Sequence, residues 1–144
     1  MNYIIRGIPA AFVPKLWPHC EAFVKRALDH ANGEITHRDV LEFCEDRAMQ
    51  LWCVSEGNKI VGAVTTEIVN YRQKKVCRVI TLSGKDFDVW SRDLDRLLLE
   101  WAGEQGCVGV EACVRRGFVK KLGALGYKEK YDLVYKAIGE EHHG

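Results

Sequence analysis

At the start of the chain, apolar residues first recur at every second position, as in a strand, and then at the spacing of a helix. Asn2 to Ile8 alternates apolar and polar side chains, which predicts a first strand. Next come Pro14 and Pro18, followed by apolar residues that recur along one helical face. Prolines fit the first turn of a helix, and Asn32-Gly33 is a typical helix stop, so we expect a helix between these signals.

The next part of the chain predicts a second helix and then a hairpin. Thr36 and Asp39 have the spacing of a capping pair, so the second helix is expected directly after them. Leu51–Val54 and Lys59–Val69 are runs rich in strand-forming residues. Glu56-Gly57-Asn58 lies between them and is a typical hairpin turn.

A third strand and a long helix are expected after the hairpin. Tyr71–Lys75 is a polar connection, and the β-branched residues of Val76–Leu82 predict the strand. The helix that follows is indicated by apolar residues at intervals of three and four, and Gly103 and Gly106 end it. These apolar residues are Trp90, Leu94, Leu97, Leu98 and Trp101.

Strand and helix alternate in the last part of the chain. We expect a strand at Cys107–Val114, a short helix at Gly117–Leu125 that Gly126 stops, and a final strand region at Tyr127–Ile138. The full order is strand, two helices, three antiparallel strands, helix, strand, helix, strand. This order predicts an α/β protein of mixed α+β character, with a mostly antiparallel sheet flanked by helices.

Composition and charge are those of an ordinary globular protein. Apolar residues make up 47% of the 144 residues and the net charge is +1. We predict a single domain at residues 1–138 with a flexible C-terminal tail at 139–144. No apolar run has the length of a bilayer span and the N-terminus lacks a signal peptide pattern, so we expect a cytoplasmic protein that does not enter membranes.

The six cysteines show no metal-site spacing. None forms a C-x-x-C pair and no histidine lies at a zinc-finger distance, so we expect no metal and interpret the cysteines as small, mostly buried apolar residues. Cys113 lies near the candidate cleft described below and is the thiol to test for reactivity. Two basic clusters occur, but aromatic residues do not interleave with them, so we expect no nucleic-acid partner.

The element order and three phrases resemble the GCN5-related N-acetyltransferase (GNAT) fold, an acyl-CoA N-acyltransferase fold. The phrases are SEGNKIVGAV, the strand–turn–helix stretch from Arg78 to Gly106, and RRGFVKKLGALGYKE. The resemblance covers nearly the whole chain. It implies acetyl-CoA as cofactor if the protein is an enzyme. An open V between the Val76–Leu82 and Cys107–Val114 strands, with the ligand at Gly84, would favour an enzyme, and a closed or side-chain-filled V would favour a protein-binding adaptor.

The turn before the long helix departs from the family pattern. The family has a glycine-rich turn there, because several backbone N–H groups must converge on the cofactor pyrophosphate. This chain keeps only Gly84, so the cofactor-binding candidates form a degenerate set. Asp86 and Asp88 bring negative charge to the turn, and we expect one of them to cap the helix. The cofactor-binding candidates are Leu82, Ser83, Gly84 and Lys85.

The catalytic groups that the resemblance implies are also missing. Leu122 stands where many family members have a tyrosine that protonates the leaving thiolate, and leucine has no proton to donate. Glu67 and Glu111 lie on predicted strands and are the candidates for a general base. A glutamate in such a position is more often a solvated strand carboxylate.

Two functions of different class remain from the sequence. Thr81–Lys85 matches a phrase found in small phage internal virion proteins, which resemble acetyltransferases but lack the glycine-rich turn. This resemblance implies a non-catalytic, virion-associated component of a phage or prophage that binds a protein partner, in the host cytoplasm or the particle. The alternative is a divergent acyl-CoA-dependent N-acetyltransferase. The sequence leaves the oligomeric state open.

Overall fold

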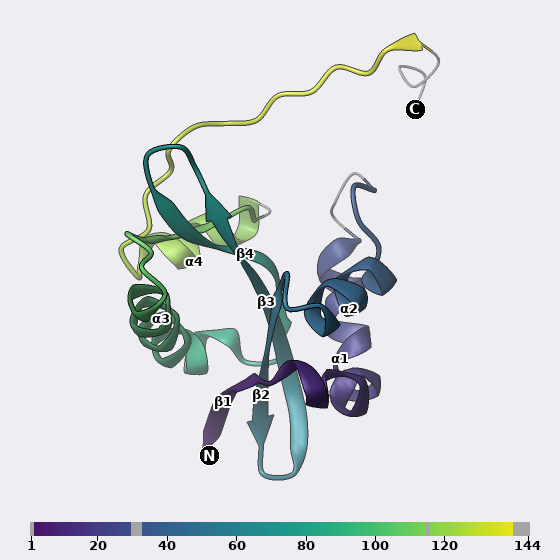
Figure 1. The fold of residues 1–144 in the computed structure, drawn as a ribbon. Helices are drawn as coiled ribbons and strands as arrows, with labels where there is room; N and C mark the ends of the chain where they lie inside the picture. Colours follow the sequence, from purple (N-terminus) through teal and green to yellow (C-terminus); the bar gives the residue numbers. More distant parts are fainter. Residues whose placement is uncertain (1, 30–32, 115, 140–144) are drawn as a thin grey trace.

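The computed structural model describes residues 2–29, 33–114 and 116–139 (Figure 1). Within them, five strands form one sheet in the order β1-β2-β3-β4-β5; the neighbours are antiparallel except for β4 and β5, which are parallel. The elements are β1 (Tyr3–Ile8), a 3-10 helix (Ala10–Phe12), α1 (Val13–Leu28), α2 (His37–Glu45), β2 (Gln50–Glu56), β3 (Lys59–Asn70), β4 (Lys75–Gly84), α3 (Phe87–Glu104), β5 (Val110–Ala112) and α4 (Arg116–Gly123). The mixed α/β architecture predicted from the sequence is confirmed.

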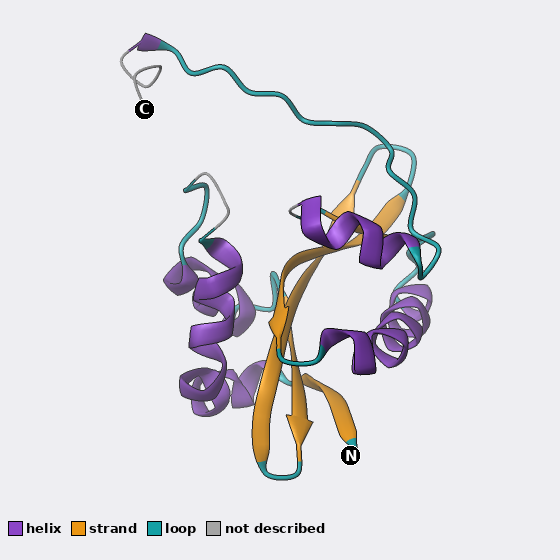
Figure 2. Ribbon diagram, turned by 180° about the vertical axis from the view of Figure 1, so that it is seen from behind, coloured by secondary structure: helices purple, strands orange, loops and turns teal. Residues whose placement is uncertain are grey.

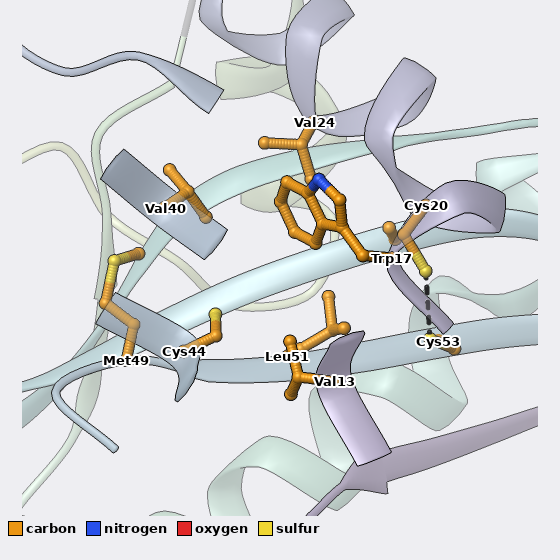
Figure 3. Close-up of a cluster of buried hydrophobic side chains, with 10 residues drawn as sticks. Val13, Trp17, Cys20, Val24, Val40, Cys44, Met49, Leu51 and Cys53 are labelled. Atoms are coloured by element: carbon orange, nitrogen blue, oxygen red, sulfur yellow. Dashed lines mark hydrogen bonds between the residues drawn. The ribbon is translucent and has the colours of Figure 1, made fainter. Parts of the chain in front are cut away.

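Helices cover both faces of the sheet. α1 and α2 lie on one side, and α3 and α4 lie on the other (Figure 2). Strand β2 shows how the period of two divides the core. Leu51 and Cys53 belong to the cluster under α1 and α2, whereas Trp52 and Val54 belong to the cluster under α3. Figure 3 shows the first cluster, in which valine, tryptophan and cysteine side chains of α1 meet β2.

The helix signals near the N-terminus are mostly confirmed. Thr36 and Asp39 form a reciprocal capping box: the Asp39 N–H donates to Thr36 Oγ1 at 3.1 Å, and the Thr36 N–H donates to Asp39 Oδ2 at 2.8 Å. Pro14 lies in the first turn of α1 as expected, but Pro18 lies inside the helix. Helix α1 ends at Leu28, before the predicted stop, of which Asn32 lies outside the described residues.

The predicted final strand at Tyr127–Ile138 is wrong in this structure. After α4 the chain turns at Gly126 (φ +96°) and continues without strand pairing, past the end of the β3–β4 hairpin and away from the body (Figures 1 and 2). A strand needs a neighbouring backbone for its N–H and C=O groups, and none runs beside this segment in the sheet. The predicted Cys107–Val114 strand is likewise shorter, at Val110–Ala112.

Two remaining expectations concern the chain as a unit. Of the predicted tail at 139–144, only Gly139 lies within the described residues. In the part of the chain that the structure describes, no helix combines the length and the apolar character needed to cross a bilayer.

Candidate functional site

Strands β4 and β5 separate after a short parallel stretch. They pair from Cys77–Val110 to Val79–Ala112 and not beyond. The register between β3 and β4 changes at the same place, from Thr66–Val79 to Thr65–Thr81, so Ile80 is the additional residue of a β-bulge. Bulges bend a strand and increase its twist. The bulge therefore turns β4 away from β5, and the two strands form an open V.

A cavity of about 150 Å³ lies in this V. One wall is the β4 stretch from Val79 to Gly84, which includes three of the cofactor-binding candidates, Leu82, Ser83 and Gly84. The fourth, Lys85, is exposed on the turn outside the lining. The other walls are Cys113 and Val114 beyond β5, Phe118 of α4, and Arg26 and Ala27 of α1. Cys113 is exposed beside the cleft, as expected.

The contributions of Arg26, Ala27 and Ile80 were missed by sequence reasoning. Arg26 and Ala27 belong to a helix some fifty residues earlier in the chain, and no local signal connects them to β4. Ile80 is one β-branched residue in a β-rich run, and nothing in that run marks the bulge. The packing of α1 across β4 brings Arg26 and Ala27 to the cleft, and the pairing register of β4 with β3 reveals the bulge at Ile80.

The closed end of the V is held by Arg78. Its Nε lies 2.7 Å from Glu111 Oε2 and its Nη2 donates to the Tyr71 hydroxyl at 2.8 Å. The Tyr71 hydroxyl in turn donates to Glu111 Oε2 at 3.0 Å. Glu67 Oε1 lies 4.0 Å from Arg78 Nη1. The cluster of Tyr71, Arg78 and Glu111 thus joins β4 to β5 and fastens the region where the two strands pair.

This cluster bears on the predicted general bases. Burial alone would raise the pKa of Glu111, but the hydrogen bonds from Arg78 and Tyr71 outweigh it, and the pKa lies below its usual value. A carboxylate held in this way is a weaker proton acceptor. Neither Glu67 nor Glu111 lines the cavity. A catalytic role for either stays a prediction, and their contacts with Arg78 favour a structural role.

The turn between β4 and α3 has only two residues, Lys85 and Asp86. The Lys85 N–H donates to the Val61 carbonyl at 2.9 Å, and the Lys85 carbonyl accepts from the Trp90 indole at 2.7 Å. A Cβ on Gly84 would lie 2.7 Å from Gly62 Cα and 2.9 Å from the Trp90 ring. The missing side chain at Gly84 therefore has a packing reason that involves no ligand.

The prediction that Asp86 or Asp88 caps α3 through its side chain is wrong. Asp86 occupies the N-cap position in the left-handed conformation (φ 57°), whereas capping side chains start from an extended backbone, and no side-chain cap bond forms. Its Oδ2 instead accepts from the Tyr3 hydroxyl at 2.8 Å, which raises the pKa of Tyr3 to about 12. Asp88 lies inside the first turn, with Oδ1 3.8 Å from Lys121 Nζ.

Aromatic rings occupy the space between the start of α3 and α4. Phe87 is buried and stands edge-on to Trp90 and to Phe118, with centroid distances of 5.0 and 5.4 Å. The Lys121 ammonium lies 6.0 Å from the Phe87 centroid and 5.7 Å from that of Phe118. The Phe87 and Phe118 rings therefore pack against each other beside the first turn of α3.

Solved structures of similar architecture include several acetyltransferases. The chain matches an aminoglycoside acetyltransferase from an uncultured soil metagenomic sample with a TM-score of 0.73, at 11% identity over 96% of this chain and 100% of that one. For glucosamine-6-phosphate N-acetyltransferase from Arabidopsis thaliana the TM-score is 0.67, at 15% identity over 95% and 99%. For a predicted acetyltransferase with acetyl-CoA from Clostridium acetobutylicum it is 0.69, at 14% identity over 99% and 100%.

The chain has the GNAT fold. No protein-family model and no curated protein matches the sequence, so the likeness is one of fold alone. Leu122, which stands in place of the tyrosine acid of the GNAT resemblance, is buried in the cluster under α3. Gly84, the one glycine of the turn that is kept, has close packing contacts that leave no space for a side chain. Cofactor binding by Leu82, Ser83, Gly84 and Lys85 stays a prediction.

Proposed function

We propose that this protein is a GNAT-fold component without acetyltransferase activity that works by binding another protein. The observation that supports this most directly is the two-residue turn between β4 and α3. A pyrophosphate needs several free N–H groups converging on it. Here the Lys85 N–H is already bonded to the Val61 carbonyl, and the bulky Phe87 and Phe118 rings pack beside the start of α3.

Charge at the same turn supports the proposal. Asp86 and Asp88 are both exposed there. A carboxylate a few Å from a phosphate costs roughly 1–4 kcal/mol at the effective dielectric of a protein surface. Lys121, 3.8 Å from Asp88, and the exposed Lys85 of the same turn offset only part of this cost. Cofactor binding at this turn would have to overcome both the lost donors and the repulsion.

The experiment is isothermal titration calorimetry with CoA and with acetyl-CoA on the full chain. We expect no saturable heat with either ligand, because the Lys85 N–H is occupied and the two-residue turn leaves few N–H groups to converge on a pyrophosphate. The Asp86→Asn/Asp88→Asn double variant is the matched control, since it removes the repulsion and leaves the short turn. It should also fail to bind. Micromolar binding by the unaltered protein would contradict the proposal.

The proposed biological setting is a phage or prophage, with the protein partner in the particle or in the host cytoplasm. The support is the Thr81–Lys85 phrase together with the short turn in which it ends. The measurement is the identity of the genes beside this one and the protein content of purified particles. Neighbouring genes for metabolic enzymes alone, with no phage genes, would contradict this setting.

The open V favours a second candidate function, a divergent acyl-CoA-dependent N-acetyltransferase. The cavity of about 150 Å³ keeps space for a small acyl group and its acceptor. Direct attack by an amine in a ternary complex needs positioning and no enzyme nucleophile. The missing proton donor at Leu122 would cost about 10²–10⁴-fold in rate, which slows the reaction without abolishing it.

Mass spectrometry of amines and proteins incubated with acetyl-CoA tests this alternative. Activity would appear as enzyme-dependent acetylation. Ala27→Phe would abolish it by filling the cavity from α1 without touching the β4–α3 turn. If no acetyl group is transferred to any acceptor and acetyl-CoA does not bind, the enzyme function is excluded and the non-catalytic function is supported.

A further inference from the structure

Two buried cysteines meet where helix α1 packs on strand β2. Cys20 lies on α1 and Cys53 on β2, and their Sγ atoms are 3.3 Å apart (Figure 3). Cys20 is completely buried and Cys53 is 5% exposed. At this distance one thiol donates a hydrogen bond to the other. Each sulfur atom therefore has a second sulfur within reach, which a single buried cysteine lacks.

The hydrogen bond makes the two thiols chemically unequal. With Cys53 as the donor, the bond stabilises the Cys20 thiolate and lowers the pKa of Cys20, although burial opposes this. The same bond raises the pKa of Cys53, which keeps its proton. The thiolate is the form of cysteine that attacks an oxidant. Cys20 is therefore the nucleophile of the pair, and Cys53 is the thiol that reacts second.

Helix α1 is weakened just before Cys20. Pro18 lies inside the helix and has no N–H, so it cannot donate to the carbonyl of Pro14, four positions earlier. A helix that lacks a bond opens locally more easily than an intact one. Such opening admits an oxidant close to the size of water, which is smaller than the reagents that titrate thiols. It also lets the two sulfur atoms approach by a further ~1.3 Å, to the length of a disulfide bond.

We propose that Cys20 and Cys53 form a site of reversible oxidation, at which hydrogen peroxide converts the two thiols into a disulfide that links α1 to β2. In the first step the Cys20 sulfur attacks one oxygen of the peroxide, the O–O bond breaks, and the departing hydroxide takes the Cys20 proton and leaves as water. Cys20 is then a sulfenic acid. In the second step the Cys53 sulfur attacks the Cys20 sulfur, the S–O bond breaks, and hydroxide leaves with the Cys53 proton as a second water. The two thiols lose two electrons and the peroxide gains them.

The disulfide fastens the helix that forms one wall of the cleft. It joins residues 33 positions apart, and closing a loop of that length restricts the unfolded chain. Arg26 and Ala27 lie on the same helix and line the cavity beside β4. Oxidation at Cys20 therefore holds α1 in the position that the cavity requires. This inference does not rest on the proposed function, since a binding protein and an enzyme would both carry the pair.

Peptide mass spectrometry of the folded full chain, treated with hydrogen peroxide and then denatured and alkylated, tests the proposal. We expect two peptides linked through Cys20 and Cys53, lighter by two hydrogen atoms than the free peptides together. Dithiothreitol should separate them again. The midpoint of thermal unfolding should rise by about 5 °C or more in the oxidised protein, because the link restricts the unfolded chain.

Two variants separate this pair from the other buried thiols. Cys53→Ala should give no linked peptides and no rise in the midpoint, and Cys20 should instead carry added oxygen. Cys44→Ala is the matched control. Cys44 is buried in the same cluster, and burial raises its pKa to about 12, so it stays a thiol at neutral pH. The link between Cys20 and Cys53 should form in Cys44→Ala as it does in the unaltered protein.

Four results would overturn the proposal. The first is the absence of the link at a peroxide dose that fully oxidises the exposed Cys113. The second is a link that forms only in denatured protein. The third is a link through Cys44 in place of either partner. The fourth is a midpoint that falls on oxidation, because the disulfide would then distort the contact between α1 and β2.

Discussion

Two physical reasons could explain why position 84 is a glycine. A glycine at the end of a strand and before a helix is typical of a phosphate-binding turn, because backbone N–H groups must approach the ligand. The structure places Gly62 Cα, the Trp90 ring and the Val61 carbonyl around the position where a Cβ would stand. The second explanation, close approach of β3 and α3, is sufficient without any ligand.

A substitution at Gly84 should therefore act on stability. Gly84→Ala puts a Cβ within 2.7 Å of Gly62 Cα and should lower the free energy of unfolding by about 1–3 kcal/mol. Gly103→Ala, where a Cβ in α3 meets nothing within 4 Å, should change it in the opposite direction by up to about 1 kcal/mol. Urea unfolding of both variants checks the pair. If Gly84→Ala left the free energy of unfolding unchanged, packing would not explain the glycine, and ligand binding would be the better explanation.

Among the elements, the separation of β4 and β5 decides where a site can exist. The two strands pair over three residues, and the cluster of Tyr71, Arg78 and Glu111 fastens that stretch. Beyond the bulge at Ile80 they diverge around the cavity. The closed end of the V is therefore held by charge and hydrogen bonds, and the open end by the twist of β4.

This fastening should depend on pH. The pKa of Glu111 is lowered in the folded state, so its pairing stabilises the fold above the unfolded value of about 4.3, and the contribution is lost as the pH falls through the lowered folded value. Glu111→Gln should reduce stability at neutral pH and flatten this acid dependence. Unfolding midpoints between pH 7 and pH 3 measure it. Glu100→Gln, on the exposed side of α3, is the control, and equal slopes in both variants would contradict the assignment.

The molecule as a whole is a sheet between two apolar clusters, and the cysteines show how completely the sheet is covered. Cys20, Cys44, Cys53 and Cys77 are buried, as the sequence predicted. The sulfur atoms of Cys20 and Cys53 lie 3.3 Å apart between α1 and β2 (Figure 3). Only Cys107, which is partly buried, and Cys113, which is exposed, lie within reach of solvent.

Thiol titration should therefore divide the six cysteines. In the folded protein Cys113 should react quickly and Cys107 slowly, and the four buried thiols should react only after unfolding, because a thiol reagent must reach the sulfur. Cys113→Ser should remove the fast phase and leave the others. Rapid reaction of more than two thiols in the native protein would show that one of the two clusters opens readily.

Local patterns accounted for most of the elements. The Glu56-Gly57-Asn58 turn, the capping box at Thr36 and the apolar stripe of α3 each follow from residues a few positions apart, and each is confirmed. The predicted final strand at Tyr127–Ile138 was wrong because the sequence has the apolar pattern of a strand, but no neighbouring strand of the described sheet pairs with it. The helix cap at Asp86 was wrong because the left-handed backbone there prevents the bond.

Most of the order of strands and helices follows from hydrophobic periodicity and turn residues, which act over short distances along the chain. The likeness to the GNAT fold came from that order together with three phrases that resemble the family. The loss of the glycine-rich turn is also visible in the sequence. The site required the tertiary structure. Its parts come from segments that meet only when the sheet twists and the helices pack on it. These parts are the bulge at Ile80, Arg26 of α1 at the cleft, the Phe118 ring against Phe87 and the contacts of Glu111.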